Sequence, residues 1–156
     1  MKQIRIVGCG SPTAGDDRLG LLAARLLRAS LPPAVDVIED VTGGADPERW
    51  CAGAEVLVIV DAAEAGPGFP AGSFLRLEYP REKARLQNVA VRDTHGLSPA
   101  YALRLAESLG LLPPEVIVYA LAGERFDPAS PPSQLWEHAL DMAVEAIRRE
   151  VLARLR

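Results

Sequence analysis

The amino-acid sequence predicts a three-layer α/β sandwich, in which a mostly parallel, twisted sheet of five strands carries helices on both faces. Two observations lead to this fold class. Apolar, β-branched segments alternate along the chain with segments whose apolar residues recur at helical spacing. The segment VLVIVD at 56–61 opens with a continuous apolar run, which is typical of a central strand buried on both faces. With 156 residues and no internal repeat, the chain is expected to form one domain over 1–156.

Each predicted element follows from a local pattern. Strands are expected where segments are apolar or alternate between apolar and polar residues: 3–9, 35–41, 56–61, 73–79 and 115–123. Helices are expected where apolar residues recur at helical spacing or an N-cap residue precedes proline: from about Leu19 to before Pro32, from Asp46, from Ser98 to about Leu109, and over 131–155. Strand 73–79 follows the central strand too closely for a helical crossover, which needs about a dozen residues. We therefore expect it to run antiparallel or to lie at an edge.

The composition of the chain limits its partners and compartment. The net charge is −4 and no basic stripe with interleaved aromatic residues occurs, so we expect no nucleic-acid partner. No apolar run approaches the roughly 20 residues that span a bilayer, and no signal-peptide core is present, so we expect no membrane association. Cys9 and Cys51 are the only cysteines, and without a CxxC spacing they favour a reducing cytoplasm. Both are expected to be small buried residues rather than catalytic thiols.

The stretch GCGSPTAGDDRLG at 8–20 combines glycines with two adjacent carboxylates. A dinucleotide fingerprint needs a third glycine leading into the helix, but Thr13 stands at that position after an interrupting proline. Two aspartates at the helix entrance would also repel a phosphate. The loop therefore indicates carboxylate chemistry rather than dinucleotide binding. We assign Asp16 to capping and loop closure, and we expect Asp17 to point into a cleft.

Two further candidate ligands lie at the end of a predicted strand and in a predicted loop. Asp61 ends the central strand, and His95 lies in the loop before the helix capped by Ser98. In open α/β sheets, ligands bind beyond the carboxyl ends of the strands. Taken singly, Asp61 could bind loop amides and His95 could be a hydrogen-bonded loop histidine. Together with Asp17 they form an O/O/N set that suits a divalent first-row metal and leaves coordination positions open, unlike a structural zinc site.

Other polar residues are less suited to such a site. His138 shares a helical face with Gln134 and Asp141, so it is expected on a solvated surface. Ser98 is better used as a helix cap, and no G-x-S-x-G nucleophile elbow is present. The candidate site therefore consists of Asp17, Asp61 and His95.

Four segments in this order resemble the hydrogenase maturation protease family, the endopeptidases that trim the C-terminus of the nickel-iron hydrogenase large subunit. They are IVGCGSPTAGDDRLG, VLVIVDAAEAGPG, THGLSPAYALRLAESLG and VYALAGERFDPASPPSQLWEHAL. The chain departs from the family pattern at Ser11, where asparagine is usual, and at Glu124 and Arg125, where glutamine and proline are usual. The stretch around Glu124 is expected to contact the partner protein and to bear on which hydrogenase is recognised.

The resemblance implies an aspartyl-type endopeptidase in which Asp17, Asp61 and His95 are the catalytic and nickel-contacting residues. It implies no tightly bound cofactor, because the nickel belongs to the substrate, the large-subunit precursor, which is cleaved after nickel insertion. The metal either polarises the scissile carbonyl or activates water, with Asp17 or Asp61 as base, or it only positions the peptide. We expect a cytoplasmic monomer.

Two other functions remain open for the same fold. One is a small-molecule metallohydrolase, which should enclose a deep pocket. The other is a noncatalytic nickel-binding accessory protein. A processing protease instead needs an open cleft at the rim of the sheet.

Overall fold

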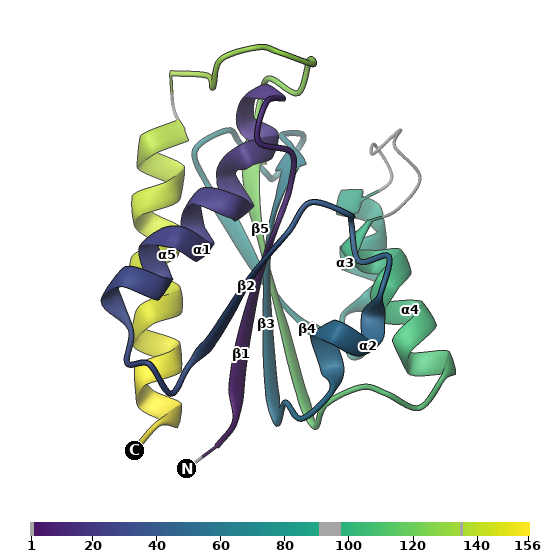
Figure 1. The fold of residues 1–156 in the computed structure, drawn as a ribbon. Helices are drawn as coiled ribbons and strands as arrows, with labels where there is room; N and C mark the ends of the chain where they lie inside the picture. Colours follow the sequence, from purple (N-terminus) through teal and green to yellow (C-terminus); the bar gives the residue numbers. More distant parts are fainter. Residues whose placement is uncertain (1, 91–97, 135) are drawn as a thin grey trace.

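The computed structural model describes residues 2–90, 98–134 and 136–156 (Figure 1). Its elements, in chain order, are β1 (Ile4–Cys9), the 3-10 helix η1 (Gly15–Arg18), α1 (Leu19–Ser30), β2 (Asp36–Asp40), α2 (Pro47–Cys51), β3 (Val56–Glu64), β4 (Phe74–Tyr79), α3 (Lys83–Ala90), α4 (Pro99–Ser108), β5 (Glu115–Gly123) and α5 (Trp136–Arg154).

The strands form one five-stranded sheet in the order β2-β1-β3-β5-β4. All neighbouring pairs are parallel except β4 and β5, which are antiparallel. Helices α1 and α5 cover one face, and α2, α3 and α4 cover the other (Figure 1). The predicted three-layer sandwich is therefore confirmed, and so is the expectation that strand 73–79 runs antiparallel at an edge.

The central strand β3 is buried on both faces, as its apolar run predicts. Val58 and Val60 pack into the core cluster under α1 and α5, whereas Leu57 and Ile59 pack into the cluster under the other helices. Successive side chains of a strand point to opposite faces, so a strand between two helical layers needs apolar residues at every position.

The predicted boundaries are wrong in two places and two elements were missed. Strand β3 continues past Asp61 to Glu64, because the equally long β5 pairs with it along its whole length. Helix α5 begins at Trp136 rather than at 131, because prolines at 131 and 132 precede Ser133, whose N–H is bonded elsewhere. Helices η1 and α3 were not predicted.

The start of α1 lies directly on the strands because Gly20 has no side chain. A methyl group there would lie 2.5 Å from the Val60 carbonyl oxygen and would also overlap the Cys9 carbonyl oxygen. Gly8, opposite on β1, approaches the Gly20 carbonyl in the same way. This close approach brings η1, which precedes α1, over the carboxyl ends of β1 and β3.

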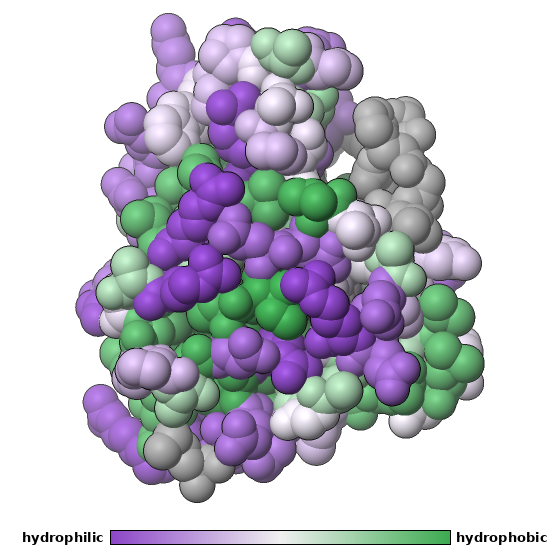
Figure 2. All heavy atoms as spheres, viewed as in Figure 1, coloured by the Kyte–Doolittle hydropathy of each residue, from purple (hydrophilic) through white to green (hydrophobic). Residues whose placement is uncertain are grey.

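Hydrophilic side chains gather over α1 and the edge strand β2 (Figure 2). Arg25 and Arg28 of α1 both form ion pairs with Glu39 of β2. The Arg28 guanidinium also donates to the Val37 carbonyl at 3.0 Å, which occupies part of the backbone of β2. Among the helices of the described ranges, none has the length and apolar character needed to cross a bilayer.

Candidate functional site

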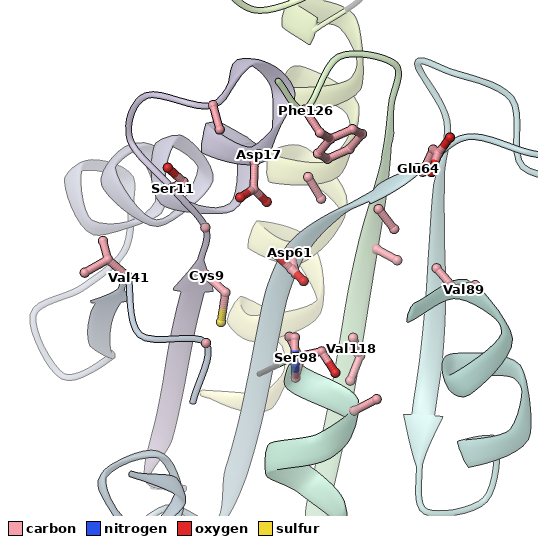
Figure 3. A pocket seen from close by; sticks show the side chains of 18 of the residues that line it. Cys9, Ser11, Asp17, Val41, Asp61, Glu64, Val89, Ser98, Val118 and Phe126 are labelled. Carbon is pink, nitrogen blue, oxygen red and sulfur yellow. The ribbon is translucent and has the colours of Figure 1, made fainter. Parts of the chain in front are cut away.

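A cavity of about 810 Å³ opens at the carboxyl edge of the sheet. Asp17 of η1 and Asp61 of β3 both line it, and Figure 3 shows their side chains facing the same hollow. Phe126, from the loop after β5, and Ser98, before α4, form other parts of its wall. The structure thus brings together two of the three predicted residues, although their catalytic and metal-contacting roles stay predictions.

The third predicted residue, His95, lies outside the described residues. Within residues 2–90, 98–134 and 136–156, no group of three or more histidine, cysteine, aspartate or glutamate side chains is arranged to hold a metal ion. The metal-contacting role of the full set therefore stays a prediction. Ser98 accepts a hydrogen bond from the Tyr101 N–H at 3.3 Å and caps α4, as predicted.

The backbone around Asp17 is fixed by a compact turn. The Asp17 N–H donates to the Ala14 carbonyl at 3.0 Å, and the Asp17 carbonyl accepts from the Ser11 N–H at 3.1 Å. Gly10, at φ 154°, lies so close to the Asp17 carbonyl that a side chain there would overlap it. The glycines of this loop therefore serve close packing of backbone against backbone, which agrees with the rejection of a phosphate-binding role.

Asp16 closes a loop but caps no helix, so the prediction for it is half right. Neither η1 nor α1 has a side-chain cap. Instead, the fully buried Asp16 carboxylate accepts hydrogen bonds from the loop that follows β5. Burial alone would raise the pKa of Asp16, but the Ser133 hydroxyl and the backbone N–H groups of that loop outweigh burial and lower this pKa below its usual value.

Cys9 lines the cavity as a buried thiol, as expected for a small packing residue. Burial, followed by the nearby carboxylates of Asp61, Asp40 and Asp17, raises the pKa of the Cys9 thiol well above its usual value. The thiol therefore stays protonated at neutral pH and is a poor nucleophile. Cys51 is buried too.

Asp40, at the end of β2, is a buried carboxylate that sequence reasoning missed. It accepts from the Thr42 N–H and hydroxyl at 2.7 and 2.6 Å and from the Trp50 indole N–H at 2.6 Å. These bonds fix the segment that includes Thr42, which lines the cavity. The signal was present, because Asp40 ends a predicted strand and two glycines follow shortly after it, as a loop requires.

The Asp40 bonds predict a pH-dependent contribution to stability. Burial opposes ionisation, but the hydrogen bonds from Thr42 and Trp50 outweigh it and lower the pKa of Asp40. Ionised Asp40 therefore stabilises the fold above its unfolded-state pKa of about 3.9, and this contribution is lost as the pH falls through the lower folded-state pKa. We expect Asp40→Asn to lower the free energy of unfolding by about 1–3 kcal/mol at pH 7.

Urea denaturation of both proteins between pH 7 and pH 3 measures this effect. The difference between wild type and Asp40→Asn should stay constant down to about pH 5 and shrink below about pH 4. A difference that grows on acidification would contradict the assignment.

The cavity wall is acidic. Besides Asp17 and Asp61, the residues Glu64, Glu124 and Asp127 line it, and no lysine or arginine is among the described lining residues. His138, in contrast, is exposed on α5, as predicted. The fold and this cavity define an α/β protein with an acidic cavity at the carboxyl edge of its sheet, where ligands bind in open α/β sheets.

Searches of protein-family models and of curated proteins found no match to this sequence. Solved structures, however, match almost the whole chain. The hydrogenase 2 maturation peptidase from a Thaumarchaeota archaeon is 26% identical, with a TM-score of 0.66, and the match covers 96% of this chain and 98% of that one. The hydrogenase maturating endopeptidase HybD from E. coli is 21% identical over 99% and 92% of the two chains, with a TM-score of 0.71.

A third structure, the [NiFe] hydrogenase maturation protease HycI from Thermococcus kodakarensis, is 22% identical over 95% and 91% of the two chains, with a TM-score of 0.68. The chain therefore has the fold of the hydrogenase maturation proteases. This confirms the resemblance that its four sequence segments carry.

Proposed function

We propose that this protein is an endopeptidase that removes the C-terminal extension of a nickel-iron hydrogenase large-subunit precursor after nickel insertion. The observation that carries the proposal is that Asp17 and Asp61, two acids 44 positions apart in the sequence, line one acidic cavity on a fold shared with maturation proteases.

The acidic residues of the cavity favour a substrate that carries a cation. Carboxylate oxygens at the rim of the sheet attract a divalent ion that a partner protein presents, and five acidic residues of the described ranges line the cavity. In the proposed reaction, nickel arrives with the precursor, and Asp17, Asp61 and His95 contact it. Cleavage then waits for a completed metal site in the substrate.

The proposed chemistry needs a base near the scissile peptide. Asp61 lies on β3, which pairs with β5 both before and after this residue. The turn of η1 fixes the backbone of Asp17. A carboxylate on such a rigid element keeps a defined position relative to a bound peptide, which is what general base catalysis requires. The Cys9 thiol is no competitor for this role, because burial keeps it protonated.

The direct test uses purified protein with nickel-loaded and nickel-free precursor, and the products are weighed by mass spectrometry. We expect a C-terminal fragment from the nickel-loaded precursor alone. Equal cleavage of both forms would refute nickel-dependent recognition. If neither form yields a fragment, the protease function is refuted and a noncatalytic nickel-binding accessory function remains. Turnover of a small amide or phosphate substrate would instead favour the metallohydrolase.

The two histidines of the chain provide a matched pair of variants for this assay. His95→Ala is expected to lower the rate of processing by at least about 10-fold, because it removes a predicted nickel contact. His138→Ala, on the exposed face of α5, should process at the wild-type rate. Undiminished processing by His95→Ala would remove His95 from the site.

A further inference from the structure

The segment Gly15–Arg18 and the loop over residues 124–133, which we name the wall loop, are joined through their backbones. The Asp16 N–H donates to the Arg125 carbonyl at 2.6 Å, and the Gly15 N–H donates to the Ser130 carbonyl at 3.0 Å. Arg18 adds a bond from its guanidinium to the Ser130 carbonyl at 2.7 Å. Two segments more than 100 positions apart in sequence thus form one hydrogen-bonded unit.

The carboxylate of Asp16 is the centre of this unit. One oxygen accepts the Ser133 N–H at 2.7 Å, and the other accepts the Ser133 hydroxyl at 2.7 Å and the N–H groups of Glu124 and Arg125 at 2.8 and 3.1 Å. The Asp16 side chain has no exposed surface. Water therefore cannot readily replace the bonds from Ser133, and their loss would leave the buried Ser133 N–H and hydroxyl unsatisfied.

The wall loop and Asp17 border the same cavity. Glu124, Phe126 and Asp127 of the loop line it together with Asp17. Figure 3 shows Phe126 and Asp17 at this cavity. Packing supports the hydrogen bonds, because a side chain at Gly123 would collide with the Asp16 β-carbon at 2.7 Å and with the Phe126 ring at 3.0 Å. The loop can therefore approach Asp16 only because residue 123 is glycine.

We propose that Asp16 is a positioning residue, which holds the wall loop and Asp17 in one arrangement. The loop that faces a protein substrate then also fixes the position of the Asp17 carboxylate. Its effect on cleavage rests on the proposed function. Asp16 binds the backbone N–H groups of Glu124 and Arg125. Any side chain except that of proline, which has no N–H, can therefore change partner contacts at these two positions without releasing the loop.

Amide hydrogen exchange tests the coupling without any substrate. Ser133→Ala removes one hydroxyl from the far side of the unit and leaves Asp16 in place. We expect exchange to become about 10-fold faster both in the wall loop and at residues 15–18. Asp16→Asn should have a larger effect on the same segments. Val151→Ala, in the buried face of α5, is the control for a general loss of stability. It should leave the ratio of the amide exchange rates in these segments to those in the core unchanged.

Faster exchange in the wall loop alone would overturn the proposal, because it would show that the loop moves independently of Asp17. The Ser133→Ala variant keeps the test decisive if Asp16→Asn fails to fold.

Cleavage kinetics give an independent result. In Ser133→Ala, the Asp17 carboxylate should no longer be held in place, and kcat for nickel-loaded precursor should fall by about 10-fold. An effect confined to KM would show that the loop only binds substrate and would overturn the proposal. If wild-type protein cleaves nothing, the proposed function fails, and hydrogen exchange alone decides whether Asp16 couples the two segments.

Discussion

Asp61→Asn is expected to lower kcat/KM for nickel-loaded precursor by at least about 100-fold, the lower end of what a positioned general base or acid contributes. The variant keeps the size of the side chain and removes its charge. Asp61 lies on β3, paired with Ala120 of β5, and lines the acidic cavity. Loss of this carboxylate removes the proposed base or the proposed contact to the substrate's nickel, and either loss would lower kcat/KM.

Asp17→Asn should show a loss of similar size. Because the two acids are proposed to act as one unit, the double variant should be no more than a few-fold slower than either single variant. Asp141→Asn, an exposed acid on α5, is the charge-matched control and should retain wild-type activity. Circular dichroism and urea denaturation confirm that each variant is folded. Processing by Asp61→Asn within twofold of wild type would exclude Asp61 from the chemistry.

Gly20→Ala is expected to lower the free energy of unfolding by about 3 kcal/mol, the upper part of the usual range for overpacking. At an exposed helical position the same change would stabilise by about 1 kcal/mol, so the sign of the effect is informative. The added methyl group would lie 2.5 Å from the Val60 carbonyl oxygen and would overlap the Cys9 carbonyl oxygen. Both oxygens belong to buried strands, which cannot move without disturbing the core.

Urea denaturation at pH 7 measures this loss, with Ser30→Ala at the exposed end of α1 as the control, where the change should stay within about 0.5 kcal/mol. We also expect Gly20→Ala to process precursor more slowly than its stability alone explains, because α1 must shift and η1, with Asp17, precedes it directly. A stabilised Gly20→Ala protein would contradict the close packing of α1 on the sheet.

The fold could be predicted because its main signals are local. The continuous apolar run of β3 and the short connection to β4 define the buried centre and the antiparallel edge of the sheet from sequence alone. The end of β3 could not be predicted, because Ala62 and Ala63 carry no strong strand signal and only pairing with β5 extends the strand to Glu64. Helix α3 was missed because its apolar residues, such as Leu86, are too few for a clear helical period.

Some features of the candidate site could also be predicted from the sequence, and others could not. Asp17 and Asp61 could be placed on one cavity because Asp17 follows β1 and Asp61 lies near the carboxyl end of the parallel strand β3, a rule of topology rather than of side-chain detail. The bonds of Asp16 could not be predicted, because its partner Ser133 lies 117 positions away and supplies a backbone N–H that any residue type except proline has. Asp40 could have been found by the rule that identified Asp61, because each lies at or near the carboxyl end of its strand.

The contact of Arg28 with the Val37 carbonyl bears on how molecules of this protein meet one another. An open strand at the border of a sheet presents unsatisfied backbone groups that a strand from a second molecule can extend, which leads to aggregation. The guanidinium engages one such carbonyl and places a positive charge beside the border strand, where an incoming chain would have to displace it. We therefore expect substitution of Arg28 to expose the Val37 carbonyl for intermolecular β-pairing.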